Sequence, residues 1–499
     1  MSVLLKTIPY QLKDPSLLDN KCFIGSKWVE SSTGKSFAVL DPEDDQTICH
    51  VPDLSRREIQ EAIGVAHESF LEYRRKPARE RRALLRKWAD LIKANKEDLA
   101  AICTLELGKP FTESLGTVKY GTDYLDWFDG LIEQVGGETI PAARPDNRII
   151  TIRQPQGVVA AITPWNSPIA MIARKAGAAI AVGNTVVCKP APETPLCAIA
   201  LAKLAERAGY PPGVFNVVTV SPERTPEIGA ELCENPKVRH LSFTGSTAVG
   251  RFLNGECAKR MKRTSMELGG NAPFIVFEDA KLGQAVDGLI ASKFRSSGQT
   301  CVCANRILVH ETIFQEFAER LAKRVPEALT SGSVWDPKTN YGPLYSGKGL
   351  AKVQQHWDDA VKHGAKVLLS DESPRGPNFV SPTILSLPSG MDNLASLAFS
   401  NEETFGPLAI LVPFAKEEEA VRYANSTSTG LASYFYTSDF SRIWRVAEAL
   451  ETGMVGVSVG LVSAVEMPFG GIKQSGVGRE GGAHCLEEYT ELKAITIGI

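Results

Sequence analysis

The stretch GVVAAITPWNSPIAMIARKAGAAIAVGNTVVCK, residues 157–189, carries the clearest fold signal in the chain. Its two ends, GVVAAIT and TVVCK, are short apolar runs rich in β-branched residues, a composition typical of buried strands. The segment between them, SPIAMIARKAGAAIAVG, is predicted to be a helix. Two strands joined through a helix form a βαβ unit, in which the strands lie parallel in one sheet.

The same alternation continues toward the C-terminus. VFNVVTV at 214–220 and RHLSF at 239–243 are predicted strands, and PLCAIALAKLAERAG at 195–209 is a predicted helix. A second stretch of this kind runs from Asn271 to about residue 470. The sequence therefore predicts an α/β fold, with a parallel sheet covered by helices on both faces.

Two other segments frame these blocks. Residues 56–76 and 78–109 are predicted to form long polar helices, with apolar residues at helical spacing and charge on the other face. Residues 136–157 predict two strands around a Pro-Asp-Asn turn. A projecting hairpin of this kind suits the assembly of oligomers.

Composition excludes several classes of protein. A chain of 499 residues is expected to form two or three domains, and 55 basic against 58 acidic residues give a net charge of −3 without a basic block. Nucleic-acid and membrane-surface binding are therefore not expected. The N-terminus does not have the pattern of a secretory signal, and no apolar run approaches the roughly 20 residues of a membrane span. We expect a cytoplasmic protein.

Two glycine-rich motifs suggest phosphate binding, and only one has the right context. Gly476-Val-Gly-Arg-Glu-Gly481 matches the dinucleotide pattern, but no strand precedes it, which predicts a turn-rich loop. At residues 241–250 a strand meets Gly245 and a helix opens at Ser246, so free amides and the positive end of the helix dipole are available to a phosphate. Arg251-Phe252 replaces the Lys-Ser/Thr of a P-loop, which disfavours a nucleoside triphosphatase. An ordinary N-capped helix is the alternative.

The segment KFRSSGQTCVCANR, residues 293–306, contains Cys301 and Cys303. The ten cysteines are scattered, which argues against a disulfide framework, and no second CxxC or HxxxH supplies the further ligands that a metal site needs. Core packing and a nucleophilic role for Cys301 both stay open. A nucleophile needs a base, because a free thiol is only about 3% ionised at pH 7. Glu267, in the nearby run MELGGN, is the available carboxylate.

The chain as a whole resembles the aldehyde dehydrogenase superfamily, from about residue 22 to residue 499. Within that superfamily it is most similar to the succinate-semialdehyde dehydrogenases, notably the fungal cytosolic kind. The motifs that carry the resemblance occur in the family's order: Pro164-Trp-Asn166, Lys189-Pro190, Phe243-Thr-Gly-Ser246, Glu267-Leu-Gly-Gly270, Gly298-Gln-Thr-Cys301, Glu403-Thr-Phe-Gly-Pro407 and Pro468-Phe-Gly-Gly471.

The resemblance implies a catalytic set of three residues. Cys301 attacks the aldehyde carbon, and the side-chain amide of Asn166 together with the Cys301 N–H holds the oxyanion. Glu267 activates the water that hydrolyses the resulting thioester, and it can also help to deprotonate Cys301. Intact residues at all three positions disfavour a catalytically silent scaffold protein, and Glu267 disfavours a CoA-acylating enzyme.

A nicotinamide cofactor is also implied. The resemblance assigns Lys189 and Glu403 to its ribose hydroxyls, Ser246 with Gly245 to the pyrophosphate, and Trp165 and Phe405 to the cleft that holds it. NAD-preferring relatives carry a glutamate three residues after the lysine, where this chain has Pro192, followed by Glu193. We therefore expect NADP to be used, with NAD as the alternative.

Substrate choice is implied by fewer residues. In semialdehyde-specific relatives two arginines and a serine hold a distal carboxylate, and the matching residues here are Arg174, Arg295 and Ser463. Each arginine taken alone has a structural ion pair as its alternative role. Succinic semialdehyde, an intermediate of GABA catabolism, is the expected substrate. Ser167 and Ser458 depart from the family pattern and keep open a different aldehyde in a specialised pathway.

The resemblance also implies a domain plan and a redox hypothesis. Residues 1–137 and 157–270 form a Rossmann-type dinucleotide-binding domain, residues 271–475 a catalytic domain, and residues 138–156 with 476–499 an oligomerisation arm that builds homodimers or homotetramers. Cys303 is a candidate redox partner of Cys301, with small-residue packing as the alternative. No metal is expected.

Overall fold

The structure is a computed structural model that describes residues 4–371, 376–387 and 394–499. Its first half is built around an eight-stranded sheet in the order β2-β1-β9-β8-β7-β10-β11-β21. The five central strands are parallel, which confirms the predicted βαβ units, and the outer strands are antiparallel. The bounds are β1 (Cys22–Ile24), β2 (Lys27–Val29), β7 (Val158–Ile162), β8 (Thr185–Lys189), β9 (Phe215–Val217), β10 (Val238–Thr244), β11 (Arg263–Glu267) and β21 (Gly476–Val477).

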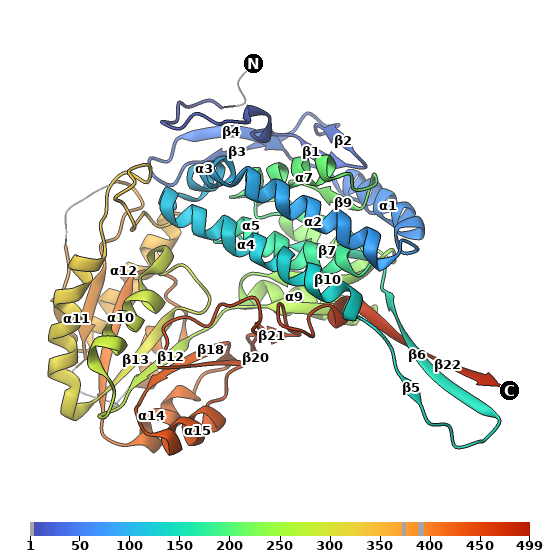
Figure 1. The fold of residues 1–499 in the computed structure, drawn as a ribbon. Helices are drawn as coiled ribbons and strands as arrows, with labels where there is room; N and C mark the ends of the chain where they lie inside the picture. The colour runs from blue at the N-terminus through green and yellow to red at the C-terminus, as the bar shows by residue number, and fades with distance from the viewer. Residues whose placement is uncertain (1–3, 372–375, 388–393) are drawn as a thin grey trace.

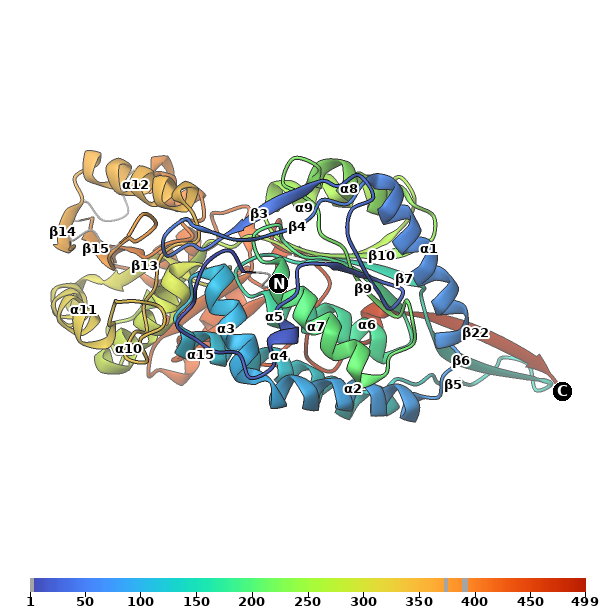
Figure 2. The same cartoon turned by 90° about the horizontal axis from the view of Figure 1, so that it is seen from above.

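Helices cover both faces of this sheet, as Figure 2 shows from above. On one face α1 (Arg56–Tyr73), α8 (Thr225–Glu234) and α9 (Thr247–Ala258) enclose one apolar cluster with the strands. On the other face a larger cluster lies beneath a second group of helices. That group is α2 (Ala78–Ala94), α3 (Lys96–Leu107), α4 (Phe111–Leu131), α5 (Pro168–Ile172), α6 (Ala178–Ala181) and α7 (Pro195–Ala208), with the π-helical turn η3 (Ala173–Gly177) between α5 and α6.

The prediction for residues 78–109 is wrong in two respects. The helix is broken at Asn95, whose φ of −112° and ψ of 25° are not helical and whose Nδ2 donates to the carbonyl of Leu91. The second piece, α3, is also not a polar helix, because all ten residues from Asp98 to Leu107 are buried between neighbouring helices. The charged side chains of α3 made the segment look like an exposed amphipathic helix. Asp98 and Glu106 are instead buried, and both accept hydrogen bonds from backbone N–H groups.

The strand order places a crevice between β7 and β10. From β7 the chain adds β8 and then β9 on one side, whereas β10 and β11 extend the sheet on the other. The loops that leave β7 and β10 therefore diverge, and open α/β sheets bind ligands at such a switch point, beyond the carboxyl ends of the strands. The loop after β7 carries Trp165 and Asn166, and the turn after β10 carries Gly245 and Ser246.

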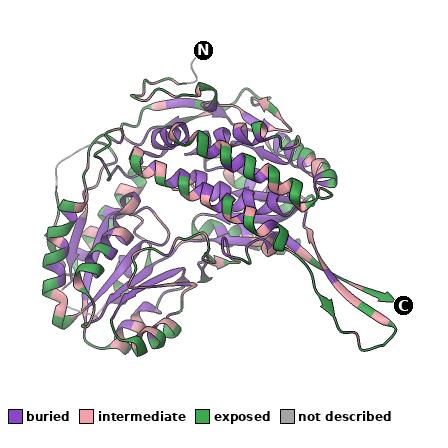
Figure 3. Ribbon diagram, viewed as in Figure 1, coloured by how far each residue is buried: buried purple, intermediate pink, exposed green. Residues whose placement is uncertain are grey.

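A seven-stranded sheet organises the second half, in the order β14-β15-β16-β13-β12-β18-β19. All its neighbours are parallel except the β14–β15 edge pair, and its strands are largely buried (Figure 3). The strands are β12 (Ala272–Val276), β13 (Ala304–His310), β14 (Lys366–Leu369), β15 (Thr383–Ser386), β16 (Leu408–Phe414), β18 (Ala432–Tyr436) and β19 (Met454–Val457). The helices are α10 (Leu282–Lys293), α11 (Phe314–Ala328), α12 (Gly347–Lys362), α13 (Ala398–Asn401), α14 (Glu417–Ala424) and α15 (Phe440–Ala449).

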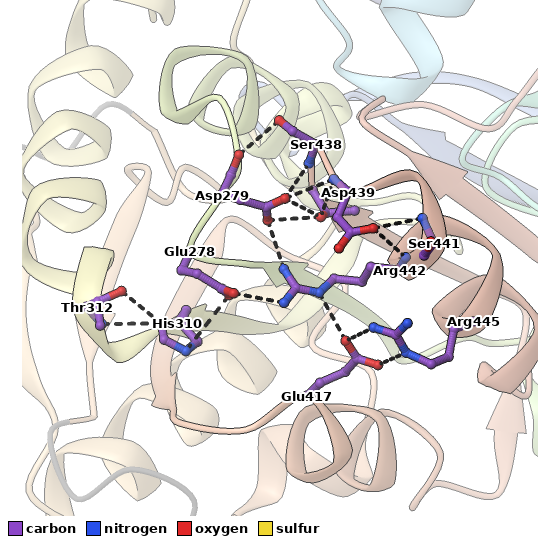
Figure 4. Close-up of polar contacts among 11 residues, drawn as sticks. Glu278, Asp279, His310, Thr312, Glu417, Ser438, Asp439, Ser441, Arg442 and Arg445 are labelled. Atoms are coloured by element: carbon purple, nitrogen blue, oxygen red, sulfur yellow. Dashed lines mark hydrogen bonds and ion pairs between the residues drawn. The ribbon is translucent and has the colours of Figure 1, made fainter.

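Arg442 fixes α15 to this sheet (Figure 4). Its guanidinium donates to Glu278 at 2.8 Å, to Asp279 at 2.9 Å and to Glu417 at 3.0 Å, and it lies 4.5 Å from the ring centroid of Phe277. The carboxylates belong to the turn after β12 and to the start of α14. Three elements distant in the sequence are thus joined through one side chain.

The predicted hairpin is present and projects from the body of the molecule (Figure 1). It consists of β5 (Thr139–Ile140) and β6 (Asn147–Pro155). The C-terminal strand β22 (Thr490–Gly498), which the sequence did not predict as a strand, pairs antiparallel with β6 along nine residues. The arm therefore joins two distant parts of the chain, and its role in assembly stays a prediction.

The remaining strands form two small ribbons, β3 (Ser36–Leu40) with β4 (Thr47–Pro52), and β17 (Thr429–Gly430) with β20 (Ile472–Lys473). The glycine-rich motif at 476–481 consists of the edge strand β21 followed by a turn, and a turn-rich loop was predicted there. Within the described part of the chain, no helix has both the length and the apolar character needed to cross a membrane.

Candidate active site

A cavity of about 490 Å³ lies where the crevice of the first sheet meets the turn that precedes β13. Its wall includes residues from α4, from the loops after β7 and β10, and from the segment that carries Cys301. Most residues predicted for the site are brought together here. They are Trp165, Asn166, Arg174, Gly245, Ser246, Arg295, Cys301, Glu403, Phe405 and Ser463.

Four predicted residues do not belong to this wall: Lys189, Pro192, Glu267 and Cys303. Glu267 ends β11 and adjoins Leu268 and Gly269, which do line the cavity. Lys189 ends β8, and Pro192 lies partly buried in the turn that follows. These two therefore sit further along the carboxyl edge of the sheet than the cavity itself.

Cys301 occupies a half-buried position between the short helical turn η4 (Arg295–Gly298) and β13. Burial raises the pKa of its thiol to about 12, and the charge of Glu403 acts in the same direction, whereas Arg174 opposes them. The thiol is therefore protonated at neutral pH. A nucleophilic role for Cys301 needs a base to remove that proton.

Asn166 is tied to the cysteine loop from the opposite side of the cavity. Its side-chain Nδ2 donates to the backbone carbonyl of Gln299 at 2.9 Å, and its backbone carbonyl accepts from Lys109 Nζ at 3.2 Å. A primary amide carries two N–H groups, so this bond leaves one available to a ligand. Sequence reasoning missed Lys109, and nothing in the pattern around it pointed to the site.

The carboxyl group of Glu267 is buried, with 2% of the residue exposed, and its Oε2 has no hydrogen-bond partner among the described residues. Burial raises its pKa well above the usual range, and the charge of Glu480 adds to this effect. A raised pKa means that the carboxylate of Glu267 binds an abstracted proton more tightly than an exposed one would, which suits a general base.

Glu480 is the second residue that sequence reasoning missed. It lies within the glycine-rich motif at 476–481, which was predicted to be a turn-rich loop. It accepts hydrogen bonds from Arg174 Nε and Lys175 Nζ, and all three side chains are buried. Burial alone would raise the pKa of Glu480, but the charges of Lys175 and Arg174 hold it below its usual range. Its partners lie about 300 residues earlier, at separations of 305 and 306, so no local pattern could reveal them.

Arg174 has the structural ion pair that the sequence left open as its alternative role. Its Nε donates to Glu480, and its guanidinium lies 4.4 Å from the ring centroid of Phe469. Its Nη1, however, is buried without a hydrogen-bond partner among the described residues, and the residue lines the cavity. Buried donors are normally satisfied, so an unpartnered N–H beside a cavity indicates a missing acceptor.

Arg295 has no ion pair within 4.0 Å and no hydrogen bond that its side chain donates, in the part of the chain that the structure describes. Its Nε is buried, and the side chain borders the same cavity as Cys301. Ser463 borders that cavity from the loop before β20. A structural ion pair for Arg295 is therefore not observed.

The residues predicted to hold the cofactor lie along the carboxyl edge of the first sheet. Ser246 caps α9 by accepting from Val249 N at 3.5 Å, which leaves the first amides of the helix for an anion. The rings of Trp165 and Phe405 meet edge to face with centroids 5.6 Å apart. A Cβ on Gly269 would lie only 2.9 Å from Glu403 Oε2. Glycine thus lets the carboxyl of Glu403 pack against the backbone there.

Two ionisable groups of this edge have shifted pKa values. Burial lowers the pKa of Lys189 to about 8, although Glu193 opposes the shift, and burial raises the pKa of Glu403 to about 8. Among the described residues, Lys189 Nζ donates only to the carbonyl of Pro190, at 3.3 Å, so it has capacity for a further acceptor. A helix N-terminus, a lysine and a carboxyl that takes hydroxyl donors are a donor set that fits a nicotinamide dinucleotide.

Cys303 is buried and is not among the residues that line the cavity. Its Sγ lies 2.8 Å from Thr300 Oγ1 and 3.9 Å from the carbonyl of Lys293. Both Cys301 and Cys303 are free thiols in this structure. The redox role of Cys303 stays a prediction.

The two departures from the family pattern occupy informative places. Ser167 lines the cavity next to Asn166. Ser458 has a φ of +55°, a conformation that asparagine and glycine adopt more readily than serine, and it directly follows β19. The position therefore holds the serine in a conformation that serine seldom adopts.

Residues 28–495 match the model of the aldehyde dehydrogenase family. A succinate-semialdehyde dehydrogenase [NADP(+)] of Schizosaccharomyces pombe is 48% identical over 493 residues, 97% of each chain. A glutarate-semialdehyde dehydrogenase of Pseudomonas putida is 49% identical over 98% of this chain and all of its own. Among solved structures, the succinate-semialdehyde dehydrogenase of Burkholderia pseudomallei superposes with a TM-score of 0.95 at 46% identity, covering 98% of this chain and 100% of that one.

Proposed function

Because the chain belongs to the aldehyde dehydrogenase family, we propose that it oxidises succinic semialdehyde to succinate with NADP, and with NAD as a second cofactor. The aldehyde is a short chain with a carboxylate at its far end. A cavity that holds a thiol at one point and unsatisfied cationic donors at another is complementary to such a molecule.

One observation carries the choice of substrate. Arg174 Nη1 and Arg295 Nε are both buried, both lack an acceptor among the described residues, and both residues line the cavity that contains Cys301. A carboxylate offers two oxygens to such donors, and hydrogen bonds between charged groups are roughly twice as strong as neutral ones. Ser463 supplies a third donor at the same cavity.

The protein residues divide the chemistry among themselves. Glu267 removes the proton of Cys301, whose sulfur attacks the aldehyde carbon, while Asn166 Nδ2 and the Cys301 N–H hold the developing oxyanion. Glu267 passes that proton to solvent and then deprotonates a water, whose oxygen attacks the thioester carbon. The acid is released, and the sulfur of Cys301 leaves and takes up a proton. The nicotinamide cofactor supplies the hydride acceptor when it is bound.

The cofactor would be held by Lys189, Glu403 and Ser246 along the sheet edge. Two features support NADP over NAD. Pro192 offers no carboxylate to repel a 2′-phosphate, and Lys189 has donor capacity beyond its bond to Pro190. Burial raises the pKa of Glu193, the next residue in the chain, and the charge of Lys189 opposes this shift.

We also propose how copies of the chain assemble and where the enzyme works. The arm of β5, β6 and β22 presents an open sheet edge and would join copies of the chain into homodimers or homotetramers. The division into a dinucleotide-binding domain, a catalytic domain and this arm corresponds to the three largest sheets. We expect the enzyme to work in the cytoplasm.

A second candidate function keeps the chemistry and changes the aldehyde. Ser167 in the cavity wall and the strained Ser458 differ from the family pattern, and one relative acts, by its name, on glutarate semialdehyde. The test is to compare initial rates for succinic semialdehyde, glutaric semialdehyde and butanal with each cofactor, using Cys301→Ala as the blank. Fastest turnover of succinic semialdehyde supports the proposal, and fastest turnover of either competitor replaces it.

A further inference from the structure

The turn between Arg295 and Cys301 has an unusual backbone. Ser296 and Ser297 both have a φ of +52°, in the left-handed region, and Gly298 follows at +78°. Residues other than glycine seldom adopt this conformation, and two in succession persist only where the surroundings impose it. The turn connects the proposed carboxylate-binding arginine to the nucleophile, so whatever imposes it also sets their separation.

Glu113 makes two hydrogen bonds to the first residue of the turn, Ser296. Its Oε1 accepts from the backbone N of Ser296 at 2.7 Å and from the Ser296 hydroxyl at 2.9 Å. Glu113 lies in the first turn of α4, 183 residues earlier in the chain, and it borders the cavity. A carboxylate that accepts two bonds from one residue fixes both its backbone and its side chain.

Two further contacts close the turn from other sides. The hydroxyl of Ser297 donates to the carbonyl of Gly342 at 2.7 Å. A Cβ on Gly298 would lie 2.3 Å from the carbonyl oxygen of Gly406, so only glycine fits there. These contacts seat the end of the turn near Cys301. At the end next to Arg295, Glu113 holds the N–H and the hydroxyl of Ser296, while the carbonyl of Ser296 accepts from Gln299 Nε2 at 3.2 Å.

We propose that Glu113 is a positioning residue that orients Arg295 for carboxylate recognition, an inference that rests on the proposed function. Glu113 fixes the residue next to Arg295 without neutralising it, because no ion pair between the two lies within 4.0 Å in the described structure. The carboxylate of Glu113 accepts hydrogen bonds from Ser296, and the Nε of Arg295 has no hydrogen-bond partner among the described residues.

A competing explanation is that Glu113 acts through its charge, as a negative group in the cavity wall that repels anionic aldehydes. The two explanations predict opposite results for a pair of substitutions. Glu113→Gln removes the charge but keeps an oxygen that can accept from Ser296, whereas Glu113→Ala removes both. Positioning predicts that glutamine preserves substrate preference and alanine loses it, while repulsion predicts that both variants bind the anionic aldehyde better.

The test compares kcat/KM for succinic semialdehyde with that for butanal, an uncharged aldehyde of the same carbon number. In Glu113→Ala the ratio should fall about 10- to 100-fold, since a misplacement of about 1 Å costs up to this much, with KM for the semialdehyde changing more than kcat. Glu113→Gln should stay within about threefold of the wild type. Asp126→Ala, which removes an exposed carboxylate of the same helix, should change nothing.

A double variant identifies the route of the effect. If Glu113 acts through Arg295, the ratio in Glu113→Ala/Arg295→Met should equal the ratio in Arg295→Met alone, because the two losses are not additive. Additive losses, an unchanged ratio in Glu113→Ala, or equal losses on both aldehydes would overturn the inference. Equal losses would show general damage to the cysteine loop.

Hydrogen exchange separates this inference from the proposed function. The amide of Ser296 should exchange faster in Glu113→Ala than in the wild type and in Glu113→Gln, because only alanine removes its acceptor. If the wild type shows no preference for succinic semialdehyde, the proposed function fails, yet faster exchange would still establish Glu113 as the anchor of the turn. Unchanged exchange at Ser296 would overturn the inference whatever the substrate.

Discussion

The Nε of Arg174 donates to the Glu480 carboxylate, while its Nη1 lies buried at the cavity wall without a hydrogen-bond partner among the described residues. Glu480 holds Lys175 as well, so one carboxylate serves two buried cations. Glu480 therefore compensates the charge of Arg174 in the interior and fixes the guanidinium that we propose as a donor to the substrate carboxylate.

Replacing Glu480 with alanine should strongly destabilise the protein. The change leaves two cations without a counter-charge in the interior, and breaking a buried pair in this way costs about 3–5 kcal/mol. The measurement is urea-induced unfolding followed by intrinsic fluorescence. Glu487→Ala is the control, because its partner Arg153 is not fully buried and such pairs contribute about 1 kcal/mol or less. Equal midpoints for the two variants would contradict the assignment.

The reactivity of Cys301 should rise steeply with pH. Its pKa is raised to about 12, so the thiolate is a minute fraction at pH 7 and increases about tenfold with each pH unit below that pKa. The rate of labelling by iodoacetamide without cofactor should therefore keep rising from pH 7 to pH 10. Cys301→Ala identifies the labelled site. A rate that levels off below pH 9 would show instead that the thiolate is stabilised in the resting enzyme.

The preference for NADP should weaken as the pH rises through 8. Burial lowers the pKa of Lys189 to about 8, so its ammonium is present below that pH and is lost above it. The 2′-phosphate of NADP would bind to this ammonium, and NAD has no such phosphate. KM for NADP should therefore rise more than KM for NAD between pH 7 and pH 9.5. Glu403, whose pKa is also about 8, affects both cofactors alike, so the ratio isolates Lys189. In Lys189→Gln the ratio should not depend on pH, and a wild-type ratio that is equally flat would contradict the role of Lys189.

Cys303 should protect Cys301 from irreversible oxidation. Hydrogen peroxide converts the Cys301 thiol to a sulfenic acid, and attack by the Cys303 sulfur would form a disulfide and release water. Because Cys303 Sγ is engaged with Thr300 Oγ1, the thiol must first turn away from that contact. After peroxide treatment, dithiothreitol should restore activity in the wild type and not in Cys303→Ala. Equal recovery in both, or retained activity in peroxide, would contradict a redox pair.

The central strands β7 to β10 of the first sheet were predictable because buried parallel strands leave continuous apolar runs in the sequence. The second sheet was predicted only as a further α/β stretch, without individual strands. Ten of the residues implied by the resemblance line the cavity. What the sequence could not provide is pairing at long range. Glu113 meets Ser296 across 183 residues and Glu480 meets Arg174 across 306, and in neither case does the local sequence around the acid indicate its partner. The burial of α3 was missed because its carboxylates are satisfied by backbone N–H groups of other segments.

The central claim is that the cavity recognises a carboxylate through Arg295, and the most direct test is the kcat/KM ratio of succinic semialdehyde to butanal in the wild type and in Arg295→Met. Methionine keeps the bulk of the side chain and removes its charge. The wild-type ratio should fall by about 100-fold, in line with the loss of about 1.5–3 kcal/mol for a hydrogen bond to a charged group, while butanal turnover stays within about threefold. Equal losses for both aldehydes, or an unchanged ratio, would mean that Arg295 is structural and that the enzyme oxidises a different aldehyde.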